Sequence, residues 1–104
     1  MRAALLQITS SDSPTENLET IQGMIAEAVA NGAGFVLTPE VSNCVSLSRA
    51  HQQEVLQHEE DDSSLRALCA SAAEHGIWLS LGSFGVKTHD DDGRFANRQF
   101  LISP

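Results

Sequence analysis

The sequence predicts an α/β fold with a mixed, mostly parallel sheet, and two observations support that prediction. Short apolar runs alternate with longer segments whose apolar residues recur at helical spacing, so the order of elements is βαβαβ. Asp92-Gly93 then precedes one more strand-like run at residues 95–102, which is typical of an antiparallel hairpin. A chain of 104 residues has the size of one domain with one core.

The first strand, helix and strand follow one another without a long connection. Residues 3–8 form an apolar run that favours a strand buried on both faces. Ser13-Pro14 begins a helix, because a hydroxyl can cap it and proline suits its first turn, and Asn31-Gly32 ends it. The next strand, residues 35–38, stops at a proline and should be parallel to the first. The expected apolar face of the helix is Leu18, Ile21, Ile25, Ala28 and Val29.

A second unit repeats this pattern after a less regular stretch. Residues 49–58 favour a short helix, and the acidic run 59–62 follows it. Asp62 or Ser63 can cap the next helix, which Gly76 ends, and residues 77–82 form the third strand. The expected apolar face of this helix is Leu65, Leu68, Cys69, Ala72 and Ala73.

The charge and the apolar content argue against several classes of function. Fourteen acidic residues against six Lys and Arg give a net charge of -8, which would repel a nucleic-acid backbone or an anionic membrane surface. No apolar run approaches the ~20 residues that span a bilayer, and the first residues do not form a secretory signal. We therefore expect a cytoplasmic protein with no nucleic-acid partner and no membrane partner.

The residue types that commonly hold metals or cofactors form no recognisable motif. The four histidines are scattered without a convergent partner, and the acidic residues at 90–92 lack the spacing of a calcium loop. Cys44 and Cys69 form no close-spaced pair, which argues against a zinc site or a disulfide framework. Neither a metal nor an organic cofactor is expected.

Glu40 is the acidic residue that is best placed for chemistry. It follows the strand 35–38, and ligands of α/β sheets collect at the carboxyl ends of parallel strands. Partial desolvation in such a cleft would raise the affinity of its carboxylate for a proton, as a general base requires. The alternative is that Glu40 only caps a turn or a following helix, since carboxylates at strand ends also have structural uses.

Four segments, in order, resemble one known family. The most telling is Gly-Ala-Gly-Phe-Val-Leu-Thr-Pro-Glu at 32–40. The others are Ala-Leu-Leu-Gln at 4–7, Ile-Trp-Leu-Ser-Leu-Gly-Ser-Phe at 77–84 and Phe-Ala-Asn-Arg-Gln-Phe-Leu-Ile-Ser-Pro at 95–104. Together they resemble the amino-terminal part of the nitrilase, or carbon-nitrogen hydrolase, superfamily, and most closely its branch of deaminated glutathione amidases.

The resemblance implies that residues 1–104 are the amino-terminal portion of a single hydrolase domain, an α-β-β-α sandwich. It also implies a Glu-Lys-Cys catalytic set, of which only Glu40 matches a position in this chain. The family's lysine and cysteine come later in the sequence. Lys87 precedes the hairpin and so does not occupy the lysine position, and the family's cysteine motif does not surround Cys44. Members of the family commonly assemble, so a homo-oligomer of the full-length protein is expected.

The resemblance implies that the full-length protein hydrolyses a non-peptide amide bond in a small carboxylated amide, with Glu40 as general base and no activity in the 104-residue chain alone. The alternative is a non-catalytic α/β binding or interaction module. Gln7, Asn17 and Asn97 are expected to shape strand ends and turns. Residues 41–44 differ from the bulky aromatic residues of many family members, so the resemblance does not extend to substrate choice.

Overall fold

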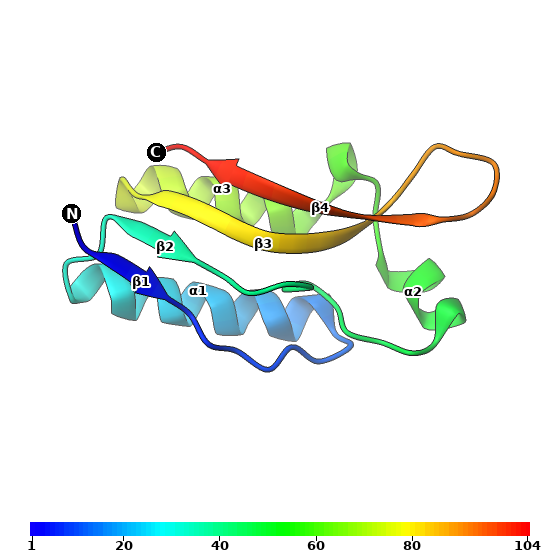
Figure 1. Cartoon of the computed structure of the whole chain (residues 1–104), viewed down its shortest axis with the longest axis horizontal. Helices are drawn as coiled ribbons and strands as arrows, with labels where there is room; N and C mark the ends of the chain where they lie inside the picture. The colour runs from blue at the N-terminus through cyan, green and yellow to red at the C-terminus, as the bar shows by residue number, and fades with distance from the viewer.

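The computed structural model describes all residues from Met1 to Pro104 and shows one sheet with helices against one of its faces (Figure 1). The strands, in their order across the sheet, are β1 (Ala3–Leu5), β2 (Phe35–Leu37), β3 (Trp78–Lys87) and β4 (Phe95–Ile102). The first three are parallel, and β4 is antiparallel to β3. The predicted mixed, mostly parallel α/β sheet is therefore confirmed.

Local capping signals fix the ends of the helices. The helices are α1 (Pro14–Ala30), α2 (Arg49–Val55) and α3 (Ser63–His75), with a 3-10 turn η1 (Glu59–Asp61) before α3. The side chain of Ser13 caps α1, that of Asp62 caps α3, and Gly76 ends α3 in the left-handed conformation. None of these helices is both long enough and apolar enough to cross a membrane.

The hydrophobic core lies between the sheet and the two long helices, α1 and α3, which lie behind the sheet in Figure 1. Burying one such side chain contributes about 1.5–3 kcal/mol, so this layer supplies most of the apolar stabilisation. Leu18 and Val29 are partly buried against it, and the predicted apolar face of α1 is confirmed. The largest fully buried side chains of this core are Ile21, Ile25, Val36, Leu68, Ile77, Leu79, Leu81 and Phe84.

Two predictions about burial are wrong. The first strand is not buried on both faces, because it lies at an edge of the sheet and Leu5 is 79% exposed. In α3, Cys69 and Ala73 are exposed, and Ser64 and Ser71 are buried instead. These serines continue the helical row through Leu68, so their position on the helix outweighs their polarity.

The second face of the sheet is uncovered in this chain. Trp78 and Leu101 on that face are 44% and 65% exposed. The strand register aligns Leu5 with Leu37 and Ser80, and Ser80 with Leu101, so these side chains share one face. The chain thus has one sheet with helices on a single face, as expected for an amino-terminal part of the α-β-β-α sandwich that the resemblance implies.

Candidate active site

Glu40 lies in the turn 38–42, directly after β2, where the parallel strands end. Its predicted position at the carboxyl end of a strand is therefore confirmed. Its side chain is exposed and lines none of the three cavities of the chain. The expected desolvation of this carboxylate is absent from residues 1–104, because no other element of the chain covers it.

Two buried hydroxyl groups close the turn that carries Glu40. Thr38 Oγ1 and Ser42 Oγ lie 2.8 Å apart, and the Ser42 hydroxyl donates to the carbonyl oxygen of Pro39. Between them, Val41 has a φ of 50°, a left-handed conformation that is rare for a β-branched residue. Strain of this kind persists only where the surrounding contacts enforce it. The backbone on either side of Glu40 is thus held in one conformation.

The turn is also fastened to the middle of β3. The amide of Val41 donates to Ser83 Oγ at 2.7 Å, and the amide of Ser42 donates to Ser83 O at 3.0 Å. On the other side of Glu40, the amide of Gly82 donates to Thr38 Oγ1 at 3.3 Å. These bonds are possible because the pairing of β3 with β4 shifts register here, which leaves Gly82 and Ser83 in a bulge.

Gly82 allows the closest backbone approach at the site. A Cβ atom there would lie 2.5 Å from the carbonyl carbon and oxygen of Pro39 and 2.6 Å from Thr38 O. The interpretation of Gly82 as the end of a strand is wrong, since β3 continues to Lys87. Glycine is needed here for contact between β3 and the turn, and the strand passes through the bulge without ending.

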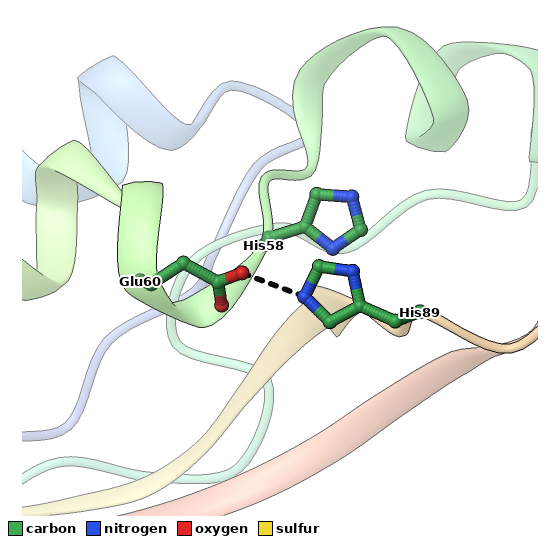
Figure 2. Close-up of side chains that lie close together, drawn as sticks. All are labelled: His58, Glu60 and His89. Carbon is green, nitrogen blue, oxygen red and sulfur yellow. Dashed lines mark hydrogen bonds and ion pairs between the residues drawn. The ribbon is translucent and has the colours of Figure 1, made fainter.

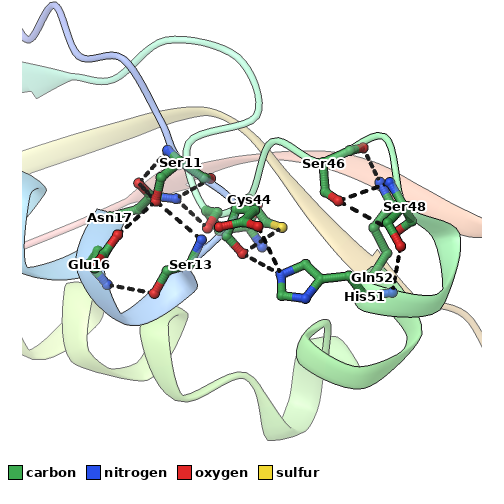
Figure 3. Close-up of polar contacts among 11 residues, drawn as sticks. Ser11, Ser13, Glu16, Asn17, Cys44, Ser46, Ser48, His51 and Gln52 are labelled. Atoms are coloured by element: carbon green, nitrogen blue, oxygen red, sulfur yellow. Dashed lines mark hydrogen bonds and ion pairs between the residues drawn. The ribbon is translucent and has the colours of Figure 1, made fainter.

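An asparagine continues the pairing of the two segments beyond the turn. The side chain of Asn43, 3% exposed, donates to Gly85 O at 2.8 Å and accepts from Gly85 N at 2.9 Å. Asn17 Nδ2 donates to Asn43 O at 2.8 Å, and Asn17 also bonds the backbone of Ser11 in both directions (Figure 3). The predicted structural role of Asn17 is confirmed, whereas Gln7 and Asn97 are exposed and take no part in this network.

Cys44 lies beside this network as a buried thiol. Its Sγ donates to the carbonyl oxygen of Asp12 at 3.4 Å, and His51 Nε2 lies 2.8 Å from the same oxygen (Figure 3). Burial, and to a lesser extent the charge of Asp12, raise the pKa of the Cys44 thiol. A raised pKa lowers the thiolate fraction and with it nucleophilicity, in agreement with the prediction that Cys44 is not the nucleophile.

The structure brings together two histidines that the sequence did not connect. His58 and His89 stack with ring centroids 4.2 Å apart, and Glu60 Oε1 lies 2.6 Å from His89 Nε2 (Figure 2). The prediction that the histidines have no convergent partner is therefore wrong. A parallel bridge between His58 and Lys87 brings the segments that carry His58 and His89 together, and no local sequence pattern predicts such a bridge.

Comparisons with known proteins agree on one family. The sequence model of the carbon-nitrogen hydrolases matches residues 2–104. The deaminated glutathione amidase of Rattus norvegicus is 32% identical over 87 residues, which are 84% of this chain and 26% of that protein. The C. elegans NitFhit protein superposes with a TM-score of 0.87 at 26% identity, over 97% of this chain and 24% of that one.

A third similar structure is a mutant of the amidase from Nesterenkonia sp. AN1, which shows covalent addition of the acetamide moiety of fluoroacetamide at its active-site cysteine. Its TM-score is 0.77 at 25% identity, over 99% of this chain and 38% of that one. The sheet and its helices are thus the amino-terminal part of a nitrilase fold. The chain belongs to the carbon-nitrogen hydrolase family, and it spans about a quarter of the length of the rat amidase.

Proposed function

We propose that these residues belong to an enzyme that hydrolyses the carbon-nitrogen bond of a small carboxylated amide, with Glu40 as its general base. The observation that carries this proposal is the position of Glu40 on a fixed turn at the carboxyl end of β2, in a chain of the carbon-nitrogen hydrolase family. The similarity to a deaminated glutathione amidase supports an amide with carboxylate groups as the substrate class.

In the proposed reaction, a cysteine sulfur attacks the amide carbon while Glu40 accepts the thiol proton. Glu40 then delivers that proton to the departing nitrogen, and ammonia leaves as the acyl-enzyme forms. A lysine stabilises the oxyanion. Water then attacks the acyl carbon while Glu40 accepts one of its protons, the carbon–sulfur bond breaks to release the carboxylic acid, and Glu40 returns the proton to the cysteine sulfur. We assign the lysine and the cysteine to sequence outside these 104 residues, so the chain alone should be inactive.

A general base must stay within hydrogen-bond reach of the proton that it takes, so its backbone has to be fixed. The two bonds from Val41 N and Ser42 N to Ser83 provide this, because they tie the residues that follow Glu40 to a paired strand. The exposed carboxylate follows β2, a strand of the sheet whose second face is uncovered in this chain. Elements that cover this face in the full-length protein would provide the desolvation that residues 1–104 do not.

The test is ammonia release from a panel of short ω-amides and from deaminated glutathione, with the 104-residue chain and with a version extended to the natural stop codon. The matched variants are Glu40→Gln and Glu19→Gln, since Glu19 is an exposed glutamate of α1. We expect activity in the extended protein and in its Glu19→Gln variant, and a loss of about 10²-fold or more in Glu40→Gln. Activity that survives Glu40→Gln would contradict the assigned role.

A further inference from the structure

The side chains of His58, Glu60 and His89 form a cluster outside the candidate active site. One potential metal-ligand atom from each of the three lies within 4.8 Å of the other two (Figure 2). The cluster joins two parts of the chain. His58 directly precedes η1 and Glu60 lies within it, whereas His89 follows β3. Imidazole nitrogen and carboxylate oxygen are ligands that Zn²⁺ and similar late transition metals accept together.

Backbone contacts hold these two parts of the chain in place independently of the cluster. The amide of Lys87 donates to Gln57 O at 2.9 Å, which continues the parallel bridge between His58 and Lys87. An ion pair of 2.8 Å between Arg98 and Glu59 adds a second connection, from β4 to η1. The three side chains thus stand on segments that are already in register, as a preformed binding site requires.

One nitrogen of the cluster lacks the partner that a buried polar atom normally has. His58 Nδ1 is buried and forms no hydrogen bond. Leaving such a group unpaired costs about 1–3 kcal/mol, and an ion or a water molecule commonly explains it. The other two side chains are exposed, His89 to 72% and Glu60 to 58%, so little packing opposes a change of rotamer in either.

We propose that His58, Glu60 and His89 bind one divalent transition-metal ion, with Zn²⁺ as the best match. Zinc bonds to histidine nitrogen and carboxylate oxygen measure about 2.0–2.2 Å, which places the ligand atoms of a tetrahedral site about 3.3 Å apart. In the observed arrangement the rings of His58 and His89 are stacked and nearly parallel, so the exposed His89 ring must turn out of the stack before both histidines can point a nitrogen at one ion. Three protein ligands leave the fourth position to water, and the bound ion would clasp the β3–β4 hairpin to η1.

The experiment is a calorimetric titration of the full-length protein with ZnCl₂, together with the variants His89→Ala and Glu60→Gln. Their matched controls are His75→Ala and Glu74→Gln, at two positions near the end of α3 and outside the cluster. Removing one ligand should weaken the binding of one zinc equivalent by more than about tenfold, whereas the controls should bind as the wild type does. Zinc should also raise the unfolding temperature of the wild type more than that of either ligand variant.

Cobalt provides a second measurement that does not depend on stability. Co²⁺ in the site should give tetrahedral absorption bands without the charge-transfer band of a thiolate ligand, and His89→Ala should lose those bands. The proposal is overturned if the wild type takes up no zinc, or if zinc binds His89→Ala and Glu60→Gln as tightly as it binds His75→Ala. His89→Ala and Glu60→Gln each replace an exposed side chain, and the unfolding temperature of every variant without metal serves as the check on its fold.

Discussion

The body of the parallel strands and their polar end, the segment 38–43 directly beyond β2, are held in place by different forces. In the strands themselves, Val36 and Leu79 are fully buried against α1 and α3 by apolar contacts. Directly beyond β2, the buried residues are Thr38, Ser42 and Asn43, and hydrogen bonds to the middle of β3 hold them. Apolar contact is non-directional, whereas a hydrogen bond fixes both distance and angle, so the polar end is the one that can set the position of Glu40.

The comparison also separates stability from function. Loss of an apolar contact removes stabilisation in proportion to the cavity that it leaves, wherever the cavity lies. Loss of one partner in the polar end leaves another group buried without a hydrogen bond and releases the turn at the same time. Variants of the apolar layer should therefore lose stability, and variants of the polar end should lose stability and activity together.

The largest effect is expected for Leu79→Ala in the apolar layer. Leu79 is fully buried in the core, and a leucine-to-alanine change at such a site costs about 2–5 kcal/mol. Urea denaturation of the full-length protein measures the free energy of unfolding. The control is Leu47→Ala in the segment before α2, where the residue is fully exposed and the expected change is within about 0.5 kcal/mol.

The next effect is that of Asn43→Ala in the polar end. Both the amide and the carbonyl of Gly85 would lose their partner, and we expect a cost of about 2–3 kcal/mol. Asn97→Ala is the matched control, since Asn97 lies opposite Gly85 in the strand register and its own side chain is exposed. Equal losses in the two variants would show that the buried amide side chain does not clasp the strands.

Signals within a few residues allowed most elements to be predicted. The caps at Ser13 and Asp62, the stop at Gly76 and the hairpin strand Phe95–Ile102 all depend on local chemistry, and the structure confirms them. Glu40 could be placed as well, because its position follows from the end of a strand. Its solvent exposure could not, because that depends on which other elements cover the sheet.

The hydrogen bonds between Asn43 and Gly85 and the histidine cluster could not be predicted, because they join residues that are far apart in the sequence. Asn43 and Gly85 are separated by 42 positions, and Glu60 and His89 by 29. The bulge at Gly82 leaves no local trace either, since a glycine within an apolar run is equally consistent with the end of a strand. These features arise only when the strands are in register.

A third variant, Gly82→Ala, tests whether the close approach at the bulge positions the turn that carries Glu40. The added Cβ must displace the backbone at Pro39, so we expect a loss of about 1–3 kcal/mol in stability and at least about tenfold in kcat/KM. Gly23→Ala in α1 is the control, because a Cβ there meets nothing within 4 Å and should stabilise the helix by about 0.5–1 kcal/mol. A stable and fully active Gly82→Ala protein would disprove the positioning role.

The smallest effect is a pH dependence at the cap of α3, where a polar group is buried at the edge of the apolar layer. Burial raises the pKa of the Asp62 carboxyl above 3.8, although its bonds from the amides of Leu65 and Ser64 oppose the change. A raised pKa means that the folded state binds the proton more tightly, so the stability from this group is complete below 3.8 and is lost as the pH rises through the folded-state value.

Asparagine caps a helix about as well as aspartate and has no charge to bury, so Asp62→Asn isolates this titration. We expect the variant to match the wild type at about pH 3 and to exceed it by less than about 1 kcal/mol at about pH 7, in urea denaturation at each pH. Asp61→Asn, at the exposed neighbouring position, should show no such trend. If the free energy of unfolding of the wild type instead rises relative to that of Asp62→Asn as the pH rises, attraction between the carboxylate and the amino end of α3 outweighs the desolvation of the carboxylate. Burial of a charge at the edge of the core would then be harmless where a helix end faces it.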